Sequence, residues 1–177
     1  MRPSTAILIV LTAAAFLLSA CGPENTTPHP GPSIKTKVAG DITYGTDECD
    51  WCHKTIETVR YGAELVTADG TILKFRAAEH MAAWMIANRD DAARARSVLV
   101  VDFADGQNLI GVNEALYLRS TLRPSPGQLH ITPINRDNKR MLTNIYEAYP
   151  GTFMEWDELL DLVQSNMDHL AVSDAGN

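Results

Sequence analysis

The 177-residue sequence contains only three cysteines, Cys21, Cys49 and Cys52. Cys49 and Cys52 stand three positions apart, so a disulfide between them would close a very small loop and remove little entropy from the unfolded chain. A disulfide is permitted outside the inner membrane, but one that staples a long loop needs cysteines that are distant in the sequence, and these two are close. The close pair favours a chemical role over a structural one.

Several catalytic signatures are also missing. The sequence has no Ser/His/Asp order typical of a hydrolase triad, no phosphate-binding loop and no dinucleotide-binding fingerprint. Glu155, Asp157 and Glu158 stand at the start of an expected helix, where acidic side chains interact favourably with the helix dipole. We interpret them as a charged helix start and not as a catalytic pair. We therefore expect a protein that is not an enzyme.

Basic residues are outnumbered. The chain has 15 Lys and Arg against 22 Asp and Glu, and its formal net charge is −7. This balance disfavours nucleic acid as a partner, because phosphate contacts depend on Lys and Arg. The sequence also lacks a basic run that would hold an anionic bilayer.

The one long apolar run stands near the beginning of the chain, from Ala6 to Leu18. Together with Arg2 it is typical of a secretory signal, and it is too short to span a bilayer. The segment Leu18-Ser19-Ala20-Cys21 resembles the lipobox of bacterial lipoproteins, in which cleavage precedes an acylated cysteine. We expect residues 1–20 to be a signal peptide and Cys21 to be the lipidation site. An ordinary signal peptide followed by a chance cysteine is the alternative.

The remaining sequence divides by composition. Residues 21–41 are rich in Pro, Gly, Thr and Ser and predict a flexible tether. Residues 42–105 predict a unit of strand, strand, helix and strand. Its first two strands flank Ala68-Asp69-Gly70, which is a hairpin signal. The helix is the alanine-rich "AAEHMAAWMIANRDDAARA", and the β-branched run "SVLVVDFAD" is a buried strand.

Residues 106–172 repeat this order and add a closing helix, while residues 173–177 are expected to be a disordered tail. Pro133 places the second strand of the repeat at a sheet edge, because proline cannot donate to the strand ladder. Asn135 is expected to cap the following helix, which ends before Pro150. We therefore predict an α+β fold, a tandem pair of ββαβ units after a flexible lipidated tether.

The chemistry of the chain centres on "DECDWCHKTIE", residues 47–57. Thiolates are soft ligands, and with imidazole or thioether sulfur they favour Cu(I) or zinc over hard cations. Cys49 and Cys52 on one turn can reach the same ion, and His53 could join them. The next soft donors are His80 and Met81 at the start of the first helix, and only tertiary structure can bring them close.

Other interpretations of these donors stay open. A structural zinc site usually has four Cys and His ligands in recognisable pairs, and a thioredoxin-like redox site has its CxxC between a strand and a helix. Neither pattern is present. Met81 shares a helical face with Trp84 and Met85, and methionine at that spacing is more typical of core packing than of ligation. A partly exposed copper site fits the donor types best.

The order of these features resembles the NosL family of nitrous oxide reductase accessory lipoproteins. The resemblance rests on "CDWCHKTIETVRYGAELVTADGTILKF" followed by "EHM", and on "YLRSTLRPSPGQLHITPI" and "PGTFMEWDEL" in the second half. It covers nearly all of the chain after the lipobox. It implies a pair of ββαβ units shared with organomercurial lyase, Cu(I) binding, and a metallochaperone role in denitrification. The implied partners are nitrous oxide reductase and a membrane ABC-type maturation complex.

Three positions depart from the pattern of that family. Lys54 stands where the family has methionine, Arg76 where it has aspartate, and His80 where it has cysteine. The ligands of the family therefore carry over only onto Cys49, Cys52 and Met81. A mixed set that includes His80 would hold Cu(I) and leave it transferable, whereas the loss of soft donors could instead mean weak or no copper binding.

The sequence thus leads to one main hypothesis and two alternatives. The main hypothesis is a lipid-anchored Cu(I) carrier on the periplasmic face of the cell envelope, with the outer membrane favoured over the inner. One alternative is a thiol-disulfide or redox-sensing lipoprotein that uses Cys49 and Cys52. The other is an interaction lipoprotein that binds no metal.

Overall fold

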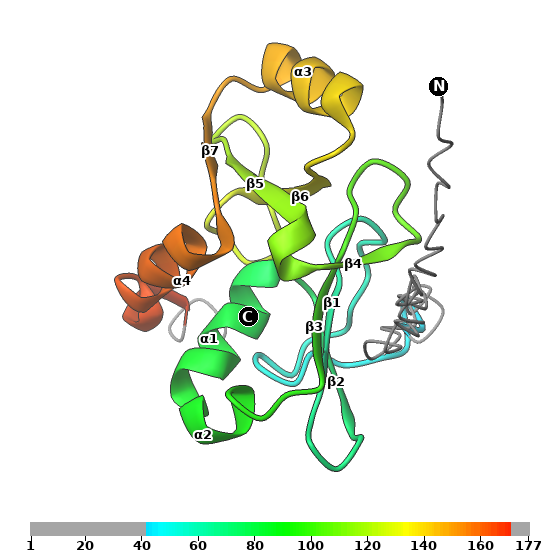
Figure 1. The fold of residues 1–177 in the computed structure, drawn as a ribbon, viewed down its shortest axis with the longest axis vertical. Coiled ribbons are helices and arrows are strands. Elements are labelled where there is room, and N and C mark those ends of the chain that lie inside the picture. The colour runs from blue at the N-terminus through cyan, green and yellow to red at the C-terminus, as the bar shows by residue number, and fades with distance from the viewer. Residues whose placement is uncertain (1–41, 171–177) are drawn as a thin grey trace, which may run out of the picture. The chain divides into compact units, whose positions relative to one another are not determined.

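The computed structural model describes residues 42–170 (Figure 1). The expected signal peptide, the lipidation site Cys21, the tether and the tail at 173–177 lie outside these residues. The described residues belong to one compact unit. None of the helices among them is long and apolar enough to cross a membrane.

The described chain forms two antiparallel sheets and four α-helices. The elements are, in order, β1 (Ala63–Val66), β2 (Ile72–Phe75), α1 (Ala78–Ala87), α2 (Arg89–Ala92), β3 (Ser97–Val101), β4 (Leu109–Gly111), a short 3-10 helix η1 (Val112–Glu114), β5 (Ala115–Arg119), β6 (Ile131–Asn135), α3 (Lys139–Ala148), β7 (Thr152–Met154) and α4 (Trp156–Gln164).

Both sheets are built on the same plan. In the first sheet the strand order is β2-β1-β3-β4, and in the second it is β6-β5-β7. In each, the first strand in sequence is flanked by the second strand, which forms a hairpin with it, and by the third, which returns after a helix. The predicted α+β fold with a tandem pair of ββαβ units is therefore confirmed.

Local signals account for several of these elements. The β1–β2 hairpin turns at Gly70, whose φ of +96° is readily adopted only by glycine. Pro133 lies in β6, which is an edge strand of its sheet, as proline requires. Helix α3 ends at Ala148, before Pro150.

Two details differ from the sequence expectation. The cap of α3 is Asn138 and not Asn135, because the Asn138 side chain accepts a hydrogen bond from the Met141 N–H at 3.1 Å. Asn135 is the last residue of β6, and its side chain accepts from the Asp137 N–H instead. The additional strand β4 follows the unit boundary expected at 105/106, yet it pairs with β3 in the first sheet.

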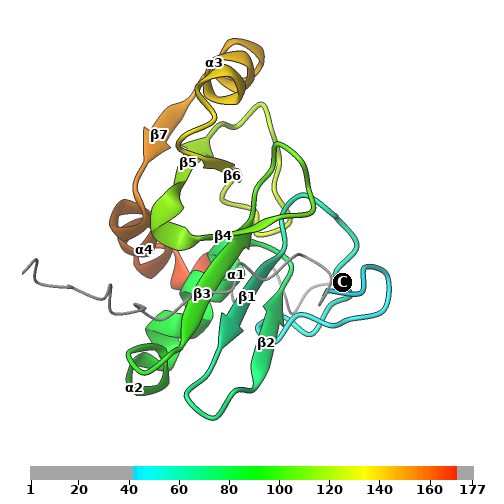
Figure 2. The same ribbon diagram turned by 45° about the vertical axis from the view of Figure 1, so that its right-hand side comes forward.

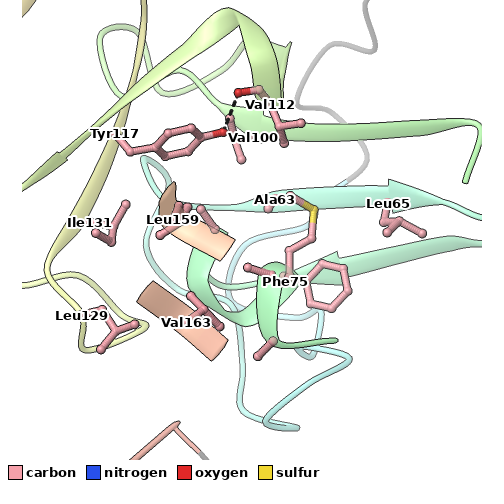
Figure 3. Packing of buried hydrophobic residues seen from close by; sticks show 14 of the residues in the cluster. Ala63, Leu65, Phe75, Val100, Val112, Tyr117, Leu129, Ile131, Leu159 and Val163 are labelled. Carbon is pink, nitrogen blue, oxygen red and sulfur yellow. Dashed lines mark hydrogen bonds between the residues drawn. The ribbon is translucent and has the colours of Figure 1, made fainter. Parts of the chain in front are cut away.

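The main hydrophobic core is shared between the two sheets. Alternate residues of β1 and β5 point into it, as the two-residue period of a strand dictates, and helices α1 and α4 pack there against each other. Figure 3 shows Phe75, Tyr117 and Leu159 in this core, with the Tyr117 hydroxyl donating to the Val112 carbonyl at 2.8 Å. Helix α1 contacts both the first sheet and β6, so its first turn lies where the two units meet.

The second sheet is also covered on its other face. Leu118 and Ile134 pack there with Ile145 of α3 in a separate cluster. Figure 2 shows α3 beside this sheet and apart from α1 and α2. Helix α3 therefore completes the second unit without taking part in the shared core.

Candidate metal centre

The CxxC segment forms a tight turn before β1. The Cys49 N–H donates to the Lys54 carbonyl at 2.9 Å, and the His53 N–H donates to the Cys49 carbonyl at 2.8 Å. His53 has a φ of +56°, in the left-handed region. This conformation reverses the chain and places both cysteines on the inner side of the turn, where both are buried.

Two aspartates fix this turn to the end of β2. The Asp47 carboxylate forms an ion pair with the Lys74 ammonium at 2.6 Å. The Asp50 carboxylate accepts from the Lys74 N–H at 2.6 Å, and the Asp50 N–H donates back to the Lys74 carbonyl at 2.8 Å. Because α1 begins only a few residues after Lys74, these contacts also bring the CxxC turn to the start of that helix.

Helix α1 begins sharply after β2. Its N-cap Ala77 is extended, with φ −160° and ψ 159°, and offers no side-chain hydrogen bond to the first turn. The N–H groups of His80 and Met81 both donate to the Ala77 carbonyl, at 3.2 and 3.3 Å. His80 therefore projects from the first turn of α1, next to the segment that the CxxC turn contacts.

The structure brings together Cys49, Cys52 and His80. One ligand atom from each lies within 4.8 Å of the others, and the Cys49 Sγ is 3.5 Å from the His80 Nδ1. The exposed fractions of these residues are 0%, 8% and 1%. Both cysteines are free thiols. The structure thus provides two sulfur donors and one nitrogen donor in a group that could hold a metal ion.

The two thiols differ in acidity. A side-chain hydrogen bond with Cys52, together with burial, raises the pKa of Cys49. The same hydrogen bond lowers the pKa of Cys52, and a hydrogen bond and the charge of His80 lower it further. The hydrogen bond between the two sulfurs thus shifts the two pKa values in opposite directions, upward at Cys49 and downward at Cys52.

Backbone N–H groups also face the two sulfurs. Backbone hydrogen bonds from Cys52 and Arg76 act to lower the pKa of Cys49, and one from Lys54 acts to lower the pKa of Cys52. Such hydrogen bonds stabilise negative charge on sulfur. Lys54 and Arg76, which stand where the resembled family has methionine and aspartate, thus face the site through their backbone groups.

The other sequence candidates have different positions. His53 is exposed and is not part of the donor group found among residues 42–170. Met81 is fully buried in the core cluster that also contains both cysteines, and its role as a ligand stays a prediction. The expectation of a partly exposed site is wrong, since all three clustered donors are buried.

Sequence reasoning did not single out Glu79, which directly precedes His80. Glu79 is completely buried, and burial raises its pKa. Its Oε1 accepts hydrogen bonds from the Ser125 hydroxyl and from the Ile131 N–H. The sequence signal that could have indicated Glu79 was an acidic residue in the first turn of an alanine-rich, largely buried helix.

Comparison with solved structures finds a match in a copper chaperone. The crystal structure of the copper chaperone NosL from Shewanella denitrificans matches with a TM-score of 0.52. The sequence identity is 18%, and the match covers 64% of this chain and 89% of that chain. No family model matches this sequence, and no curated protein matches it.

The likeness to the NosL structure concerns the fold. At this identity it supports the pair of ββαβ units and their arrangement around a shared core. The donor group of Cys49, Cys52 and His80 is an observation made on this chain alone. The two findings are independent of each other.

Proposed function

We propose that this protein is a Cu(I)-binding metallochaperone, and not an enzyme, that delivers copper to nitrous oxide reductase or a similar cuproenzyme. We further propose that lipid on Cys21 anchors it at the periplasmic face of the cell envelope and that a membrane ABC-type complex takes part in delivery. The observation that carries the proposal is the buried group of Cys49, Cys52 and His80. The likeness to the fold of a copper chaperone supports it.

The donor set fits Cu(I) as cargo. Soft thiolates with one imidazole match the preferences of Cu(I), whereas structural zinc usually takes four protein ligands. Among the described residues, three Cys and His donors come together at this point. A buried, largely apolar surrounding also limits the access of water and oxidants to the bound ion.

The ionisation of the thiols suggests an order of events. The hydrogen bond with Cys49 and the hydrogen bond and charge of His80 lower the pKa of Cys52, which at 8% exposed is also the most accessible of the three donors. Copper therefore meets Cys52 first. Cys49 then loses its proton as its sulfur joins the ion, because a metal ligand must be deprotonated. Transfer to a partner runs in reverse by ligand exchange, and no electron is gained or lost.

A competition titration with a chromophoric Cu(I) chelator tests the proposal. The wild-type soluble chain that follows Cys21 is expected to bind one Cu(I). Replacing Cys49 or Cys52 by serine should weaken binding at least about 100-fold, and His80→Ala about tenfold, on the scale of losses seen at metal sites. His53→Ala is the matched control and should leave the affinity unchanged.

The same titration has clear negative outcomes. A wild-type chain that binds no stoichiometric Cu(I) would refute the function. Binding that is unaffected in all three variants of the donor group would refute the site. Met81→Leu, measured alongside, tests whether the buried thioether is a fourth donor, because leucine keeps the volume of this fully buried side chain and removes only its sulfur.

A thiol-disulfide role is the second candidate. It is favoured by the unequal pKa values of Cys49 and Cys52, since a thiolate beside a thiol is the pattern of reactive CxxC pairs. It is disfavoured by burial, since exchange needs access to one sulfur. Alkylation with iodoacetamide as a function of pH separates the two. A rapidly alkylated Cys52 in the folded protein would support the redox role.

A further inference from the structure

Glu79 links the metal-binding helix to the second unit. It lies in the first turn of α1, beside His80, and its side chain is completely buried. The Ser125 hydroxyl donates to its Oε1, and the Ile131 N–H lies 3.4 Å from the same oxygen. The Ile131 N–H also lies 3.2 Å from the Ser125 Oγ. The Glu79 Oε1, the Ser125 hydroxyl and the Ile131 N–H thus each contact the other two at the start of β6.

The loop of residues 125–130 is shaped around this carboxylate. A Cβ atom added at Gly127 would lie 2.7 Å from the Glu79 Cδ, so the loop backbone rests directly against the side chain. Gln128 and His130 have φ values of +66° and +63°. Left-handed backbone costs free energy at residues other than glycine and is retained where surrounding contacts hold it.

The burial of Glu79 has no explanation in packing alone. Its Oε2 is buried and has no hydrogen-bond partner among the described residues. A buried carboxyl group with one unsatisfied oxygen destabilises a fold relative to an apolar side chain of similar size. Such a group in the first turn of α1, directly before a candidate metal ligand, points to a role in the site.

We propose that Glu79 is a positioning residue of the metal centre: its contact with Ser125 and Ile131 sets the rotation of the first turn of α1 and thereby aims the His80 imidazole at the two thiols. This inference rests on the proposed copper-binding function. Among residues 42–170, the three donors Cys49, Cys52 and His80 all belong to the first unit. The proposal gives the second unit the task of holding His80 in place.

The physical argument lies in how α1 begins. Its N-cap Ala77 contributes no side-chain hydrogen bond, and the neighbouring Ala78, Ala82 and Ala83 are small. Consecutive helical residues are separated by about 100° around the axis, so Glu79 and His80 point in different directions from one rigid turn. Holding the Glu79 carboxyl group against the loop therefore fixes the direction of the His80 ring.

The consequence concerns the nitrogen ligand and not the sulfurs. Glu79→Ala should weaken Cu(I) binding about tenfold, the loss expected when a supporting contact of a ligand is removed. Glu79→Gln keeps an oxygen acceptor for Ser125 and Ile131 and should restore binding to within about twofold. Ser125→Ala removes the hydroxyl donor to Glu79 but leaves the Ile131 N–H, and its loss should fall between the two.

A double-mutant cycle distinguishes positioning from general damage. If Glu79 acts through His80, then Glu79→Ala should add almost nothing to the loss already caused by His80→Ala. If Glu79 merely supports the fold, the two losses should multiply. Multiplying losses, or an unchanged affinity in Glu79→Ala, would overturn the proposal. Should Glu79→Ala fail to fold, the Ser125→Ala variant, which keeps the carboxylate, is combined with His80→Ala in the same way.

The measurement is the Cu(I) chelator titration on the soluble chain that follows Cys21, preceded by circular dichroism to confirm folding. A wild-type chain that binds no copper refutes the proposed function itself. A wild type that binds copper normally, with variants that behave like it, refutes only the role of Glu79. NMR shifts of the His80 ring in the metal-free chain give a second readout, and they should move in Glu79→Ala but not in Glu79→Gln.

Discussion

At the scale of the residue, the turn that carries both thiols depends on the backbone of His53. Its φ of +56° lies in the left-handed region, which costs most residues about 1–2 kcal/mol. Its imidazole is exposed and lies outside the donor group. The position therefore serves the shape of the turn, and glycine would adopt that shape more readily.

His53→Gly should accordingly stabilise the protein. Glycine relieves the left-handed strain, but it also gives the unfolded chain more entropy. The free energy of unfolding should therefore rise by about 0.5–1 kcal/mol. Urea denaturation followed by circular dichroism measures it. Glu57→Gly, at an exposed loop position without positive φ, is the control and should lower stability. A loss of stability in both variants would contradict the assignment of strain to His53.

Glu79 predicts a dependence of stability on pH. Burial raises its pKa above the ordinary value of 4.5, so above about pH 4.5 the native state holds a proton that the unfolded state has released. The stability contributed by the neutral carboxyl group is complete below the unfolded-state pKa and is lost as the pH rises through the folded-state pKa. A glutamine side chain does not titrate in this pH range, so Glu79→Gln lacks this dependence.

The measurement compares the urea unfolding free energies of wild type and Glu79→Gln at pH 4, 6 and 8. The stability of the wild type relative to the variant should fall as the pH rises. Because the two chains differ only at this group, titrations of groups that do not interact with it cancel in the difference; the neighbouring His80, whose charge lowers the pKa of Glu79, is the exception. A relative stability that rises with pH would show that the buried group is ionised in the native state.

At the scale of the element, the backbones of β5 and of the residue before β7 approach each other so closely that a side chain does not fit between them. Gly151 directly precedes β7, and a Cβ atom there would lie 2.1 Å from the Arg119 carbonyl oxygen of β5. Arg119 is paired with Thr152 at the beginning of the β5–β7 ladder. Any side chain at residue 151 must therefore push the two strands apart.

Gly151→Ala should destabilise the protein by about 3 kcal/mol, at the upper end of the cost of overpacking, because backbone must move. Gly111→Ala is the matched control. Gly111 has a φ of −60°, and the atoms nearest to its added Cβ belong to the flexible Glu114 side chain, the first at 3.3 Å. Its expected change is less than about 1 kcal/mol. Equal effects in a urea unfolding experiment would refute the clash.

The elements also show how far local sequence determines this fold. The β1–β2 hairpin around Gly70 and the edge position of Pro133 follow from the backbone chemistry of single residues, and both were predictable. The cap of α3 was not, because Asn135 and Asn138 both precede the helix and only the strand register shows that Asn135 still belongs to β6. Strand β4 was missed because three residues are too few to carry a pattern.

At the scale of the whole molecule, the candidate site could be predicted only in part. The donor types of Cys49 and Cys52 are evident from sequence. The meeting with His80, 31 positions away from Cys49, depends on the contacts of Asp47 and Asp50 with Lys74. The burial of the site likewise depends on tertiary packing. No short segment contains that information.

If Cu(I) binds as proposed, it should stabilise the whole fold, because the donor group of Cys49, Cys52 and His80 comes from the CxxC turn and from α1. At a free Cu(I) concentration 100 times the dissociation constant, the gain for a ligand bound only by the native state is about 2.7 kcal/mol. Thermal unfolding monitored by circular dichroism should show a higher Tm with Cu(I), reversed by a chelator. Cys49→Ser should lose the increase, and His53→Ala should keep it. An increase that persists in Cys49→Ser would place the copper elsewhere.

The shared strand order of the two sheets has a consequence for engineering. Each unit runs from an edge strand into a helix, β2 into α1 and β6 into α3, but only the first is preceded by a turn with two thiols. His80 is the third residue of α1, and the third residue of α3 is Met141. A CxxC turn could therefore be grafted in front of the second unit. One chain would then carry two CxxC turns, each before a ββαβ unit, without any new scaffold.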